Sequence, residues 1–143
     1  MTHSIETAKR SELPRILELL EEADLPVAGV DRAESFLVAR EQERLVGCIG
    51  LEIYGDVGLL RSLVVRPDTR GGGLGKLLVE RLLETARVRG VSVLYLLTTT
   101  ADEYFPRFGF EPIPRDQADS RLQASEELRG ACPDSAVCMW RRL

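Results

Sequence analysis

The segment from Arg70 to Lys76 carries the strongest chemical signal of this sequence, because four of its seven residues are glycine. Glycine has no Cβ, so the backbone N–H groups of such a loop can approach an anion closely. Helical periodicity begins at Gly73, and the first N–H groups of a helix, together with its dipole, favour phosphate. The cations Arg66, Arg70 and Lys76 gather here although the chain has a net charge of -4. The pattern predicts a site for a ligand with several negative charges.

Two common phosphate loops do not fit this segment. A Walker A loop needs a glycine five residues before its Gly-Lys pair and Ser or Thr after it, but Arg70 and Leu77 occupy these positions. The dinucleotide pattern Gly-x-Gly-x-x-Gly also fails, because its last position falls on Lys76 or Leu78. A plain glycine-rich turn that only caps a helix is the alternative interpretation.

The loop must be positioned by the strands and helices on either side of it. We expect a first strand at 4–9 and a helix from the N-cap Ser11 to Asp24, with Pro14 in its first turn. Three strands at 36–40, 44–54 and 58–66 follow, with connections so short that they must form an antiparallel meander.

After the loop, the spacing of apolar residues predicts a helix from Gly73 to Gly90. A buried strand at 91–97 follows, and the β-α-β connection makes it a parallel neighbour of the strand at 60–65. We further expect a short helix at 101–108, a strand at 110–113, a polar stretch at 115–130 with room for a helix, and a last strand at 135–140. The fold class is therefore α+β, or mixed α/β, with a partly parallel sheet.

Length and composition limit the classes of protein to consider. A chain of 143 residues has the size of one domain, so we expect a single domain over residues 1–143. No apolar run approaches the roughly 20 residues that span a membrane, and the N-terminus lacks the apolar core of a signal peptide. The negative net charge argues against a nucleic-acid surface.

The cysteines and the single histidine exclude further classes. Cys48, Cys132 and Cys138 have no CxxC spacing and do not predict a disulfide framework, so we expect a reducing compartment, the cytoplasm. With only His3 available, neither a His-based triad nor a His-rich zinc site can form, and we expect no metal.

The order Arg-x-x-Gly-x-Gly, after a strand that ends in Val-x-Pro, resembles the pyrophosphate loop of the GNAT family, the GCN5-related N-acetyltransferases. The match is close from Leu60 to Lys76, and the expected element order agrees over the whole chain. The resemblance implies the GNAT fold, a central mixed sheet of about six to seven strands with flanking helices, and acetyl-CoA as co-substrate. It implies that loop N–H groups hold the CoA pyrophosphate and that the preceding strand pairs with the pantetheine arm. The residues so implied are Leu63, Val64, Val65, Arg70, Gly71, Gly72, Gly73, Leu74, Gly75 and Lys76.

The family's second motif, Asn-x-x-Ala-x-x-x-Tyr followed by Gly-Phe, is present in altered form. Thr98 replaces the Asn and Phe105 replaces the Tyr, and both are implied as cofactor contacts. In many members that Tyr protonates the departing thiolate of CoA, which Phe105 cannot do. Tyr104, one residue earlier, is therefore our candidate for the general acid; the alternative is a tyrosine packed on the sheet or at the surface. The matching residues are Ala101, Gly109 and Phe110.

Two subgroups of the family are most similar to this chain. Leu97-Thr98-Thr99 with a later Phe and Gly-Phe is similar to the acetyltransferase domain of N-acetylglutamate synthase. The stretches 59–65, 96–101 and 132–139 also resemble N-acetyltransferases encoded in arsenic-resistance operons. The resemblance implies an amino acid or an analogue as acceptor, including an arsenic-containing one, and a part in arsenic resistance.

Acetyl transfer also needs a base that takes the proton of the amine and a group that binds the acceptor. Many family members place a Glu base on the strand before the loop, but here the nearest candidate is Glu52 on the preceding strand. A solvated strand Glu is the alternative. Arg61 lies in an otherwise apolar strand, where an unpaired charge is costly, so it should clamp a carboxylate or similar oxyanion of the substrate. The alternative is a structural ion pair, for example with Glu52; Tyr54 is a weaker candidate for the acceptor pocket.

The sequence thus predicts an acetyl-CoA-dependent N-acetyltransferase acting on a small-molecule amine by direct transfer in a ternary complex. An acyl-CoA-binding sensor without catalysis and a protein or peptide N-acetyltransferase are the alternatives. We expect no nucleic-acid or membrane partner. A homodimer is possible, because the resemblance is to a family whose members often dimerise. Cys132 and Cys138 are interpreted as ordinary small core residues rather than an arsenic site.

Overall fold

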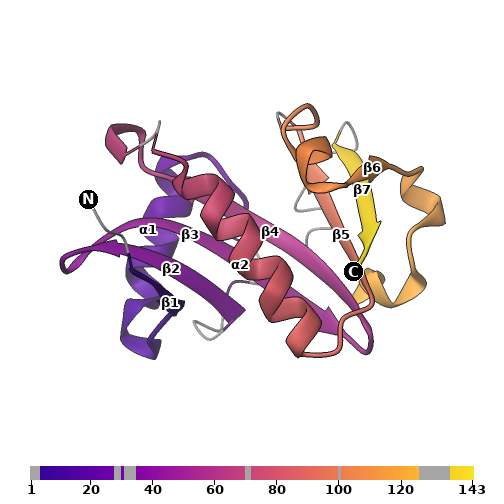
Figure 1. Cartoon of the computed structure of the whole chain (residues 1–143), viewed down its shortest axis with the longest axis horizontal. Helices are drawn as coiled ribbons and strands as arrows, with labels where there is room; N and C mark the ends of the chain where they lie inside the picture. Colours follow the sequence, from indigo (N-terminus) through magenta and orange to yellow (C-terminus); the bar gives the residue numbers. More distant parts are fainter. Residues whose placement is uncertain (1–3, 28–29, 31–34, 70–71, 100, 126–135) are drawn as a thin grey trace.

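The computed structural model describes residues 4–27, 30, 35–69, 72–99, 101–125 and 136–143. Its centre is a sheet of seven strands in the order β1-β2-β3-β4-β5-β7-β6, within the predicted size (Figure 1). The strands are β1 (Ser4–Thr7), β2 (Phe36–Glu41), β3 (Arg44–Tyr54), β4 (Val57–Val65), β5 (Val93–Thr98), β6 (Glu111–Pro112) and β7 (Val137–Arg142).

The pairing of the strands confirms the predicted topology. Strands β2, β3 and β4 form the antiparallel meander that the short connections required. Strand β5 then pairs with β4 in parallel, after the crossover through helix α2 (Leu74–Val88). The sheet is therefore mixed, because β7 returns antiparallel to β5 and carries the short β6 on its outer edge.

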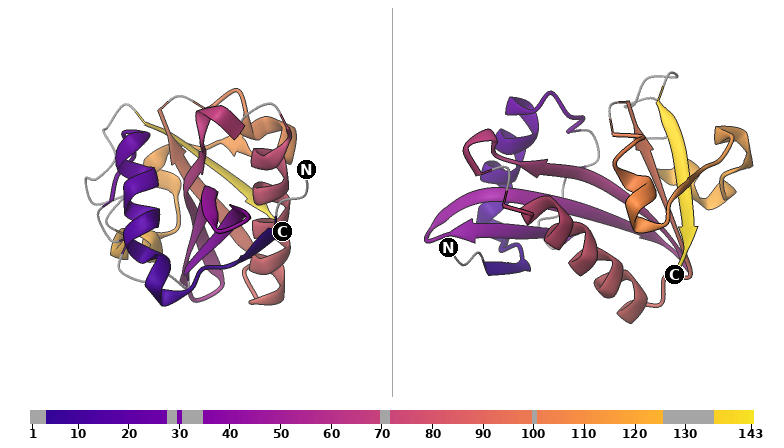
Figure 2. Two further views of the ribbon diagram at one scale, coloured as in Figure 1. Left: turned by 90° about the vertical axis from the view of Figure 1, so that its left-hand side faces the viewer. Right: turned by 45° about the horizontal axis from the view of Figure 1, so that its top comes forward.

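Two α-helices lie on opposite faces of the sheet, as the end-on view of Figure 2 shows. Helix α1 (Leu13–Glu22) places Ile16, Leu19 and Leu20 against one face, and their spacing is the apolar stripe predicted from the sequence. Helix α2 covers the other face with a longer stripe. The α2 residues in that core are Leu74, Leu78, Val79, Leu82, Leu83 and Ala86.

The structure corrects four boundaries. The 3-10 turn η1 (Arg10–Glu12) precedes α1, so Ser11 is not the N-cap of the helix. The expected helix at 101–108 is only the 3-10 turn η4 (Phe105–Phe108), which Gly109 ends in the left-handed conformation. Of the stretch 115–130, the described part up to Ser125 holds two further 3-10 turns, η5 (Arg115–Gln117) and η6 (Ser120–Ala124), and residues 126–130 lie outside the described residues. The last strand runs to Arg142. A fifth 3-10 turn, η3, spans Pro67–Thr69.

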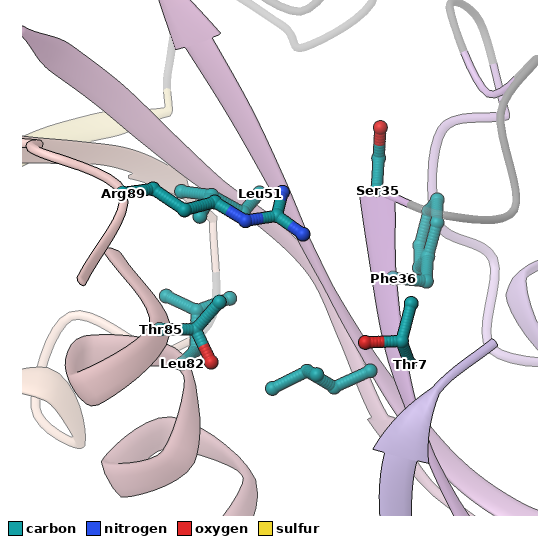
Figure 3. A pocket seen from close by; sticks show the side chains of 8 residues that line it. Thr7, Ser35, Phe36, Leu51, Leu82, Thr85 and Arg89 are labelled. Carbon is teal, nitrogen blue, oxygen red and sulfur yellow. The ribbon is translucent and has the colours of Figure 1, made fainter. Parts of the chain in front are cut away.

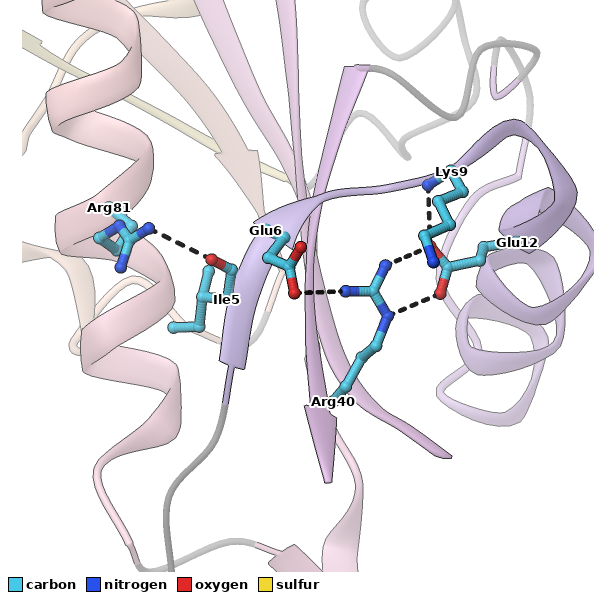
Figure 4. A network of polar contacts seen from close by, with 6 residues as sticks. All are labelled: Ile5, Glu6, Lys9, Glu12, Arg40 and Arg81. Atoms are coloured by element: carbon cyan, nitrogen blue, oxygen red, sulfur yellow. Dashed lines mark hydrogen bonds and ion pairs between the residues drawn. The ribbon is translucent and has the colours of Figure 1, made fainter. Parts of the chain in front are cut away.

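A buried ion pair ties the N-terminal elements to the sheet. Arg40 of β2 donates to both carboxylate oxygens of Glu12, and to Glu6 at 3.0 Å, while the Lys9 N–H donates to Glu12 at 2.8 Å (Figure 4). The Arg40 and Glu12 side chains are only 11% and 8% exposed. The hydrogen bonds from Arg40 lower the pKa of Glu12, against burial, which raises it. The pair therefore holds η1 and the start of α1 on strand β2.

Among the residues described, none of the helices has the length and apolar character that crossing a membrane requires.

Candidate active site

The site begins where strands β4 and β5 stop pairing. Their parallel ladder runs from Val57 opposite Val93 to Leu60 opposite Leu96, yet β4 continues to Val65 and β5 to Thr98. The C-terminal ends of the two strands thus diverge, as Figure 1 shows where β5 and β7 lean away from β1–β4. The residues predicted to pair with the pantetheine arm lie on this divergent end of β4; they are Leu63, Val64 and Val65.

Helix α2 begins at the same end of the sheet, with its first N–H groups free of any side-chain cap. Gly73 is its N-cap, in the left-handed conformation at φ 77°, and the first intrahelical bond is Leu77 N–H to the Gly73 carbonyl at 3.1 Å. A Cβ built at Gly72 or Gly73 would meet nothing within 4 Å. Open space therefore lies beside Gly72 and Gly73 at the start of α2, where the first amides of a helix favour a phosphate. The predicted ligands Arg70 and Gly71 lie outside the described residues.

Tyr104 lies over the first turn of α2. A Cβ on Gly75 would be 3.2 Å from the Tyr104 hydroxyl and 3.8 Å from the Val65 side chain, so these three residues converge. The Arg107 guanidinium lies 4.6 Å from the centre of the Tyr104 ring. Burial raises the pKa of Tyr104, although the charge of Arg107 opposes it, so the phenol keeps its proton at neutral pH.

The other two residues of the altered motif have structural partners. The Phe105 ring is buried in the core under α2, with its edge against Tyr104 and Phe110 at centroid distances of 5.4 and 5.8 Å. The Thr98 hydroxyl oxygen accepts the Ala101 N–H at 2.9 Å and so closes the turn after β5. Their predicted contacts with the cofactor stay predictions.

Glu52, Arg61 and Tyr54 form one hydrogen-bonded network across β3 and β4. Arg61 Nη1 donates to one oxygen of Glu52 at 2.7 Å, and the Tyr54 hydroxyl donates to the other at 2.6 Å. The Arg61 side chain is 2% exposed, whereas that of Glu52 is 17% exposed. Burial, together with the hydrogen bond to Glu52, raises the pKa of Tyr54 to about 12. The ion pair named above as the alternative for Arg61 is thus present; roles in base catalysis and acceptor binding stay predictions.

Three further members of this network were not predicted from the sequence. Arg61 Nε donates to the Ser62 hydroxyl at 3.0 Å, and Nη2 donates to the Pro26 carbonyl at 3.2 Å. The buried Ser125, at the end of η6, hydrogen-bonds to the Tyr54 oxygen. Only the strand register and the long loops bring these residues together, so residue spacing carried no signal for them.

Two hollows in the described structure lie away from this region. The first, of about 10 Å³, lies between the sheet and the C-terminal half of α2 and has the size of one water molecule (Figure 3). Its lining residues are Thr7, Ser35, Phe36, Leu37, Leu51, Leu82, Thr85 and Arg89. The second, of about 340 Å³, is an open hollow at the β6–β7 edge, where Arg142 lies over the Trp140 ring. Neither hollow adjoins the start of α2.

Comparison with known proteins decides the family. The model of the acetyltransferase (GNAT) family matches residues 1–110 of this chain. The chain belongs to the GNAT family. An amino-acid acetyltransferase of Pseudomonas fluorescens is 37% identical over 81 residues, which are 55% of this chain and 19% of that protein. An IAA acetyltransferase of Azospirillum brasilense is 34% identical over 100 residues, with 58% of this chain and 65% of that protein covered.

Solved structures agree with this assignment. N-acetylglutamate synthase of Neisseria gonorrhoeae, complexed with coenzyme A and N-acetyl-glutamate, matches with a TM-score of 0.83 at 26% identity, over 100% of this chain and 35% of that chain. Rv2747 of Mycobacterium tuberculosis, in complex with CoA and NLQ, has a TM-score of 0.77 at 23% identity, over 98% and 99% of the two chains, and supports the fold. This GNAT chain spans less than two thirds of the curated relatives named above.

The GNAT assignment confirms the predicted fold and the class of acetyltransferase and, with the coenzyme A bound in the gonococcal structure, acetyl-CoA as the co-substrate of the family. The relation to amino-acid acetyltransferases is confirmed as well. The comparisons give no support to the arsenic subgroup. Within the described residues no three His, Cys, Asp or Glu side chains gather as metal ligands, and Cys132 lies outside those residues.

The glycines at the two ends of α2 give a matched test of the phosphate site. Gly73 and Gly90 both have positive φ, 77° and 85°, and a Cβ at either would meet nothing within 4 Å. Alanine at either position is expected to cost about 1–2 kcal/mol of stability, the general cost of left-handed backbone. Only Gly73→Ala is expected to raise the KM for acetyl-CoA, by about tenfold, because its Cβ would stand beside the α2 amides. Steady-state kinetics check this, and equal KM values in the two variants would contradict it.

Proposed function

We propose that this GNAT domain transfers the acetyl group of acetyl-CoA to the amine of an amino acid or amino-acid-like small molecule, directly and in a ternary complex. The observation that carries the proposal is the uncapped, glycine-lined start of α2 beside the divergent end of β4. The two features together provide amides suited to phosphate and, close to them at Val65, the part of β4 that lies beyond its pairing with β5. A turn that merely caps a helix would not need the second feature.

The support for an amino-acid acceptor comes from the relatives. The Pseudomonas protein is an amino-acid acetyltransferase, as are two proteins of Neisseria meningitidis that are 27% identical over 124 residues. The gonococcal structure holds N-acetyl-glutamate beside coenzyme A. An arsenic-containing amino acid is a narrower form of the same proposal.

The places of the chain's own groups support the roles that we assign to them, and the role of Val64 or Val65 rests on the family resemblance. Bound acetyl-CoA supplies an activated acetyl thioester. The amides of Leu74, Gly75 and Lys76 hold its phosphates, and the backbone N–H of Val64 or Val65 hydrogen-bonds to the thioester oxygen. Tyr104, protonated and over Gly75, donates a proton to the departing sulfur.

Glu52 is the proposed acceptor of the amine proton. Both of its oxygens already accept hydrogen bonds, from Arg61 and Tyr54, while 17% of the side chain remains exposed. An amine or a bridging water can therefore reach the carboxylate only from its exposed side. The same occupied oxygens favour the second candidate function, a sensor that binds acyl-CoA without turning it over.

A thiol-release assay tests the proposal. Acetyl-CoA is mixed with the protein and, in separate reactions, with amino acids, arsenic-bearing analogues, polyamines and a peptide with a free N-terminus. We expect thiol release with an amino-acid-like acceptor, an N-acetyl product by mass spectrometry, and no release without acceptor. CoA binding by calorimetry without release from any acceptor would overturn the proposal in favour of the sensor, and release with the peptide alone would assign a protein acceptor.

A further inference from the structure

Strand β4 contains a bulge at the point where it leaves β5. The register against β3 passes from Gly50 opposite Arg61 to Cys48 opposite Val64, so Ile49 alone faces two residues of β4, Ser62 and Leu63. The extra residue reverses the alternation of side chains along β4. Before the bulge Leu60 lies in the core under α2; after it the residues of that core are Leu63 and Val65.

Ser62 makes the bulge by adopting left-handed backbone, with φ 62°. An L-residue with a side chain adopts this conformation at a cost in free energy and keeps it only where its surroundings hold it there. Two contacts of Ser62 do so. Its hydroxyl accepts Arg61 Nε at 3.0 Å, and its carbonyl accepts the thiol of the buried Cys48 at 3.4 Å.

Arg61 is itself held on every side, so it can act as a rigid support. Its Nη1 and Nη2 donate to Glu52 and to the Pro26 carbonyl, which come from β3 and from the segment after α1. A Cβ on Gly50 would be 3.1 Å from Arg61 Cγ, so the glycine leaves room for the arginine stem over β3. All three guanidinium nitrogens donate to protein groups, and 2% of the side chain is exposed.

We infer that Arg61 is a positioning residue: it holds Ser62 in the left-handed conformation and thereby fixes the direction of the β4 backbone that receives the acyl-CoA arm. Glu52 and Pro26 support the guanidinium, and the guanidinium supports the bulge. This role differs from the clamp for a substrate carboxylate that the sequence suggested. The inference rests on the proposed acetyl transfer.

Two substitutions at one position test the inference while leaving the Arg61–Glu52 ion pair in place. Ser62→Ala and Ser62→Gly both remove the hydroxyl, but glycine adopts positive φ without the steric cost. We expect kcat with Ser62→Ala to fall about tenfold at unchanged KM for the acceptor, and kcat with Ser62→Gly to stay near that of the wild type. Wild-type kcat with Ser62→Ala, or an equal loss with both variants, would overturn the inference.

A rescue experiment extends the test to Arg61. Arg61→Met is expected to lower kcat about tenfold, and the double variant Arg61→Met/Ser62→Gly is expected to recover it. A raised KM for the acceptor that Ser62→Gly does not rescue would overturn the inference and assign the carboxylate clamp. Thermal unfolding of each variant separates loss of fold from loss of rate. If Arg61→Met does not fold, the comparison of Ser62→Ala with Ser62→Gly tests the inference by itself.

The same variants separate this inference from the proposed function. Turnover by the wild type decides the function first. If the wild type binds CoA without turnover, the dissociation constant of CoA, measured by calorimetry, replaces kcat as the readout. We then expect Ser62→Ala to bind CoA more weakly than the wild type and Ser62→Gly to bind it as tightly as the wild type. Equal dissociation constants for the two variants would overturn the inference.

Discussion

Replacing Arg40 by methionine is expected to lower the free energy of unfolding by about 3–5 kcal/mol, the cost of removing one partner from a buried ion pair. Methionine keeps much of the arginine stem but none of its donors. Glu12, with 8% of its side chain exposed, would keep the Lys9 N–H as a partner and lose both hydrogen bonds from Arg40. Denaturant unfolding followed by circular dichroism measures the loss.

Arg44→Met is the matched control, because it makes the same exchange in the strand next to β2. Arg44 pairs with Asp68 at 3.0 Å, but these side chains are 53% and 60% exposed. Exposed pairs contribute about 0–1 kcal/mol, so this variant should unfold close to the wild type. An equal loss of unfolding free energy in the two variants would show that the burial of the Arg40–Glu12 pair does not contribute to stability.

The same pair makes the stability depend on acidic pH. The hydrogen bonds from Arg40 depress the pKa of Glu12 below its usual value, so the folded state holds the Glu12 proton less tightly than the unfolded chain does. The resulting stability is fully present above the unfolded pKa of about 4.3 and is lost as the pH falls through the lower folded value. The wild type should therefore lose its advantage over Arg40→Met on acidification below that point. A constant difference between pH 7 and pH 3 would contradict this.

The sequence was sufficient wherever local pattern decides the structure. The apolar stripes of α1 and α2 and the short turns of the β2–β4 meander predicted the elements and their pairing. The two-residue turn at Gly55-Asp56 also places Glu52 and Arg61 as diagonal neighbours on one face, which is why their ion pair could be anticipated.

Prediction failed where contacts distant in sequence override local preference. The segment 101–108 has the apolar content of a short helix, but the Thr98 hydroxyl closes a turn at Ala101 and Gly109 ends η4 with φ 86°. The bulge at Ser62 arises from register and from a guanidinium held by Pro26, which is 35 residues away along the chain. No spacing rule encodes such a contact, because the loop between the two partners could have many lengths.

Replacing Tyr104 by phenylalanine is expected to lower kcat about 100-fold with little change in the KM for acetyl-CoA, because general acid catalysis contributes at least that factor. The family motif puts its acid one position later, where this chain has the buried Phe105. The expectation therefore depends on the place of the Tyr104 hydroxyl, which converges with Val65 on Gly75 at the divergent end of β4.

Tyr95→Phe is the control for this exchange, since Tyr95 is buried against Trp140, with ring centroids 6.3 Å apart, and belongs to none of the site contacts described above. Steady-state kinetics at neutral pH, where Tyr104 is protonated, compare the two variants. A wild-type kcat with Tyr104→Phe, together with a raised KM for acetyl-CoA, would contradict the acid role and assign the hydroxyl to phosphate binding at α2. Because the variant removes one oxygen and leaves the ring in place, either result reports on the hydroxyl rather than on the packing of η4.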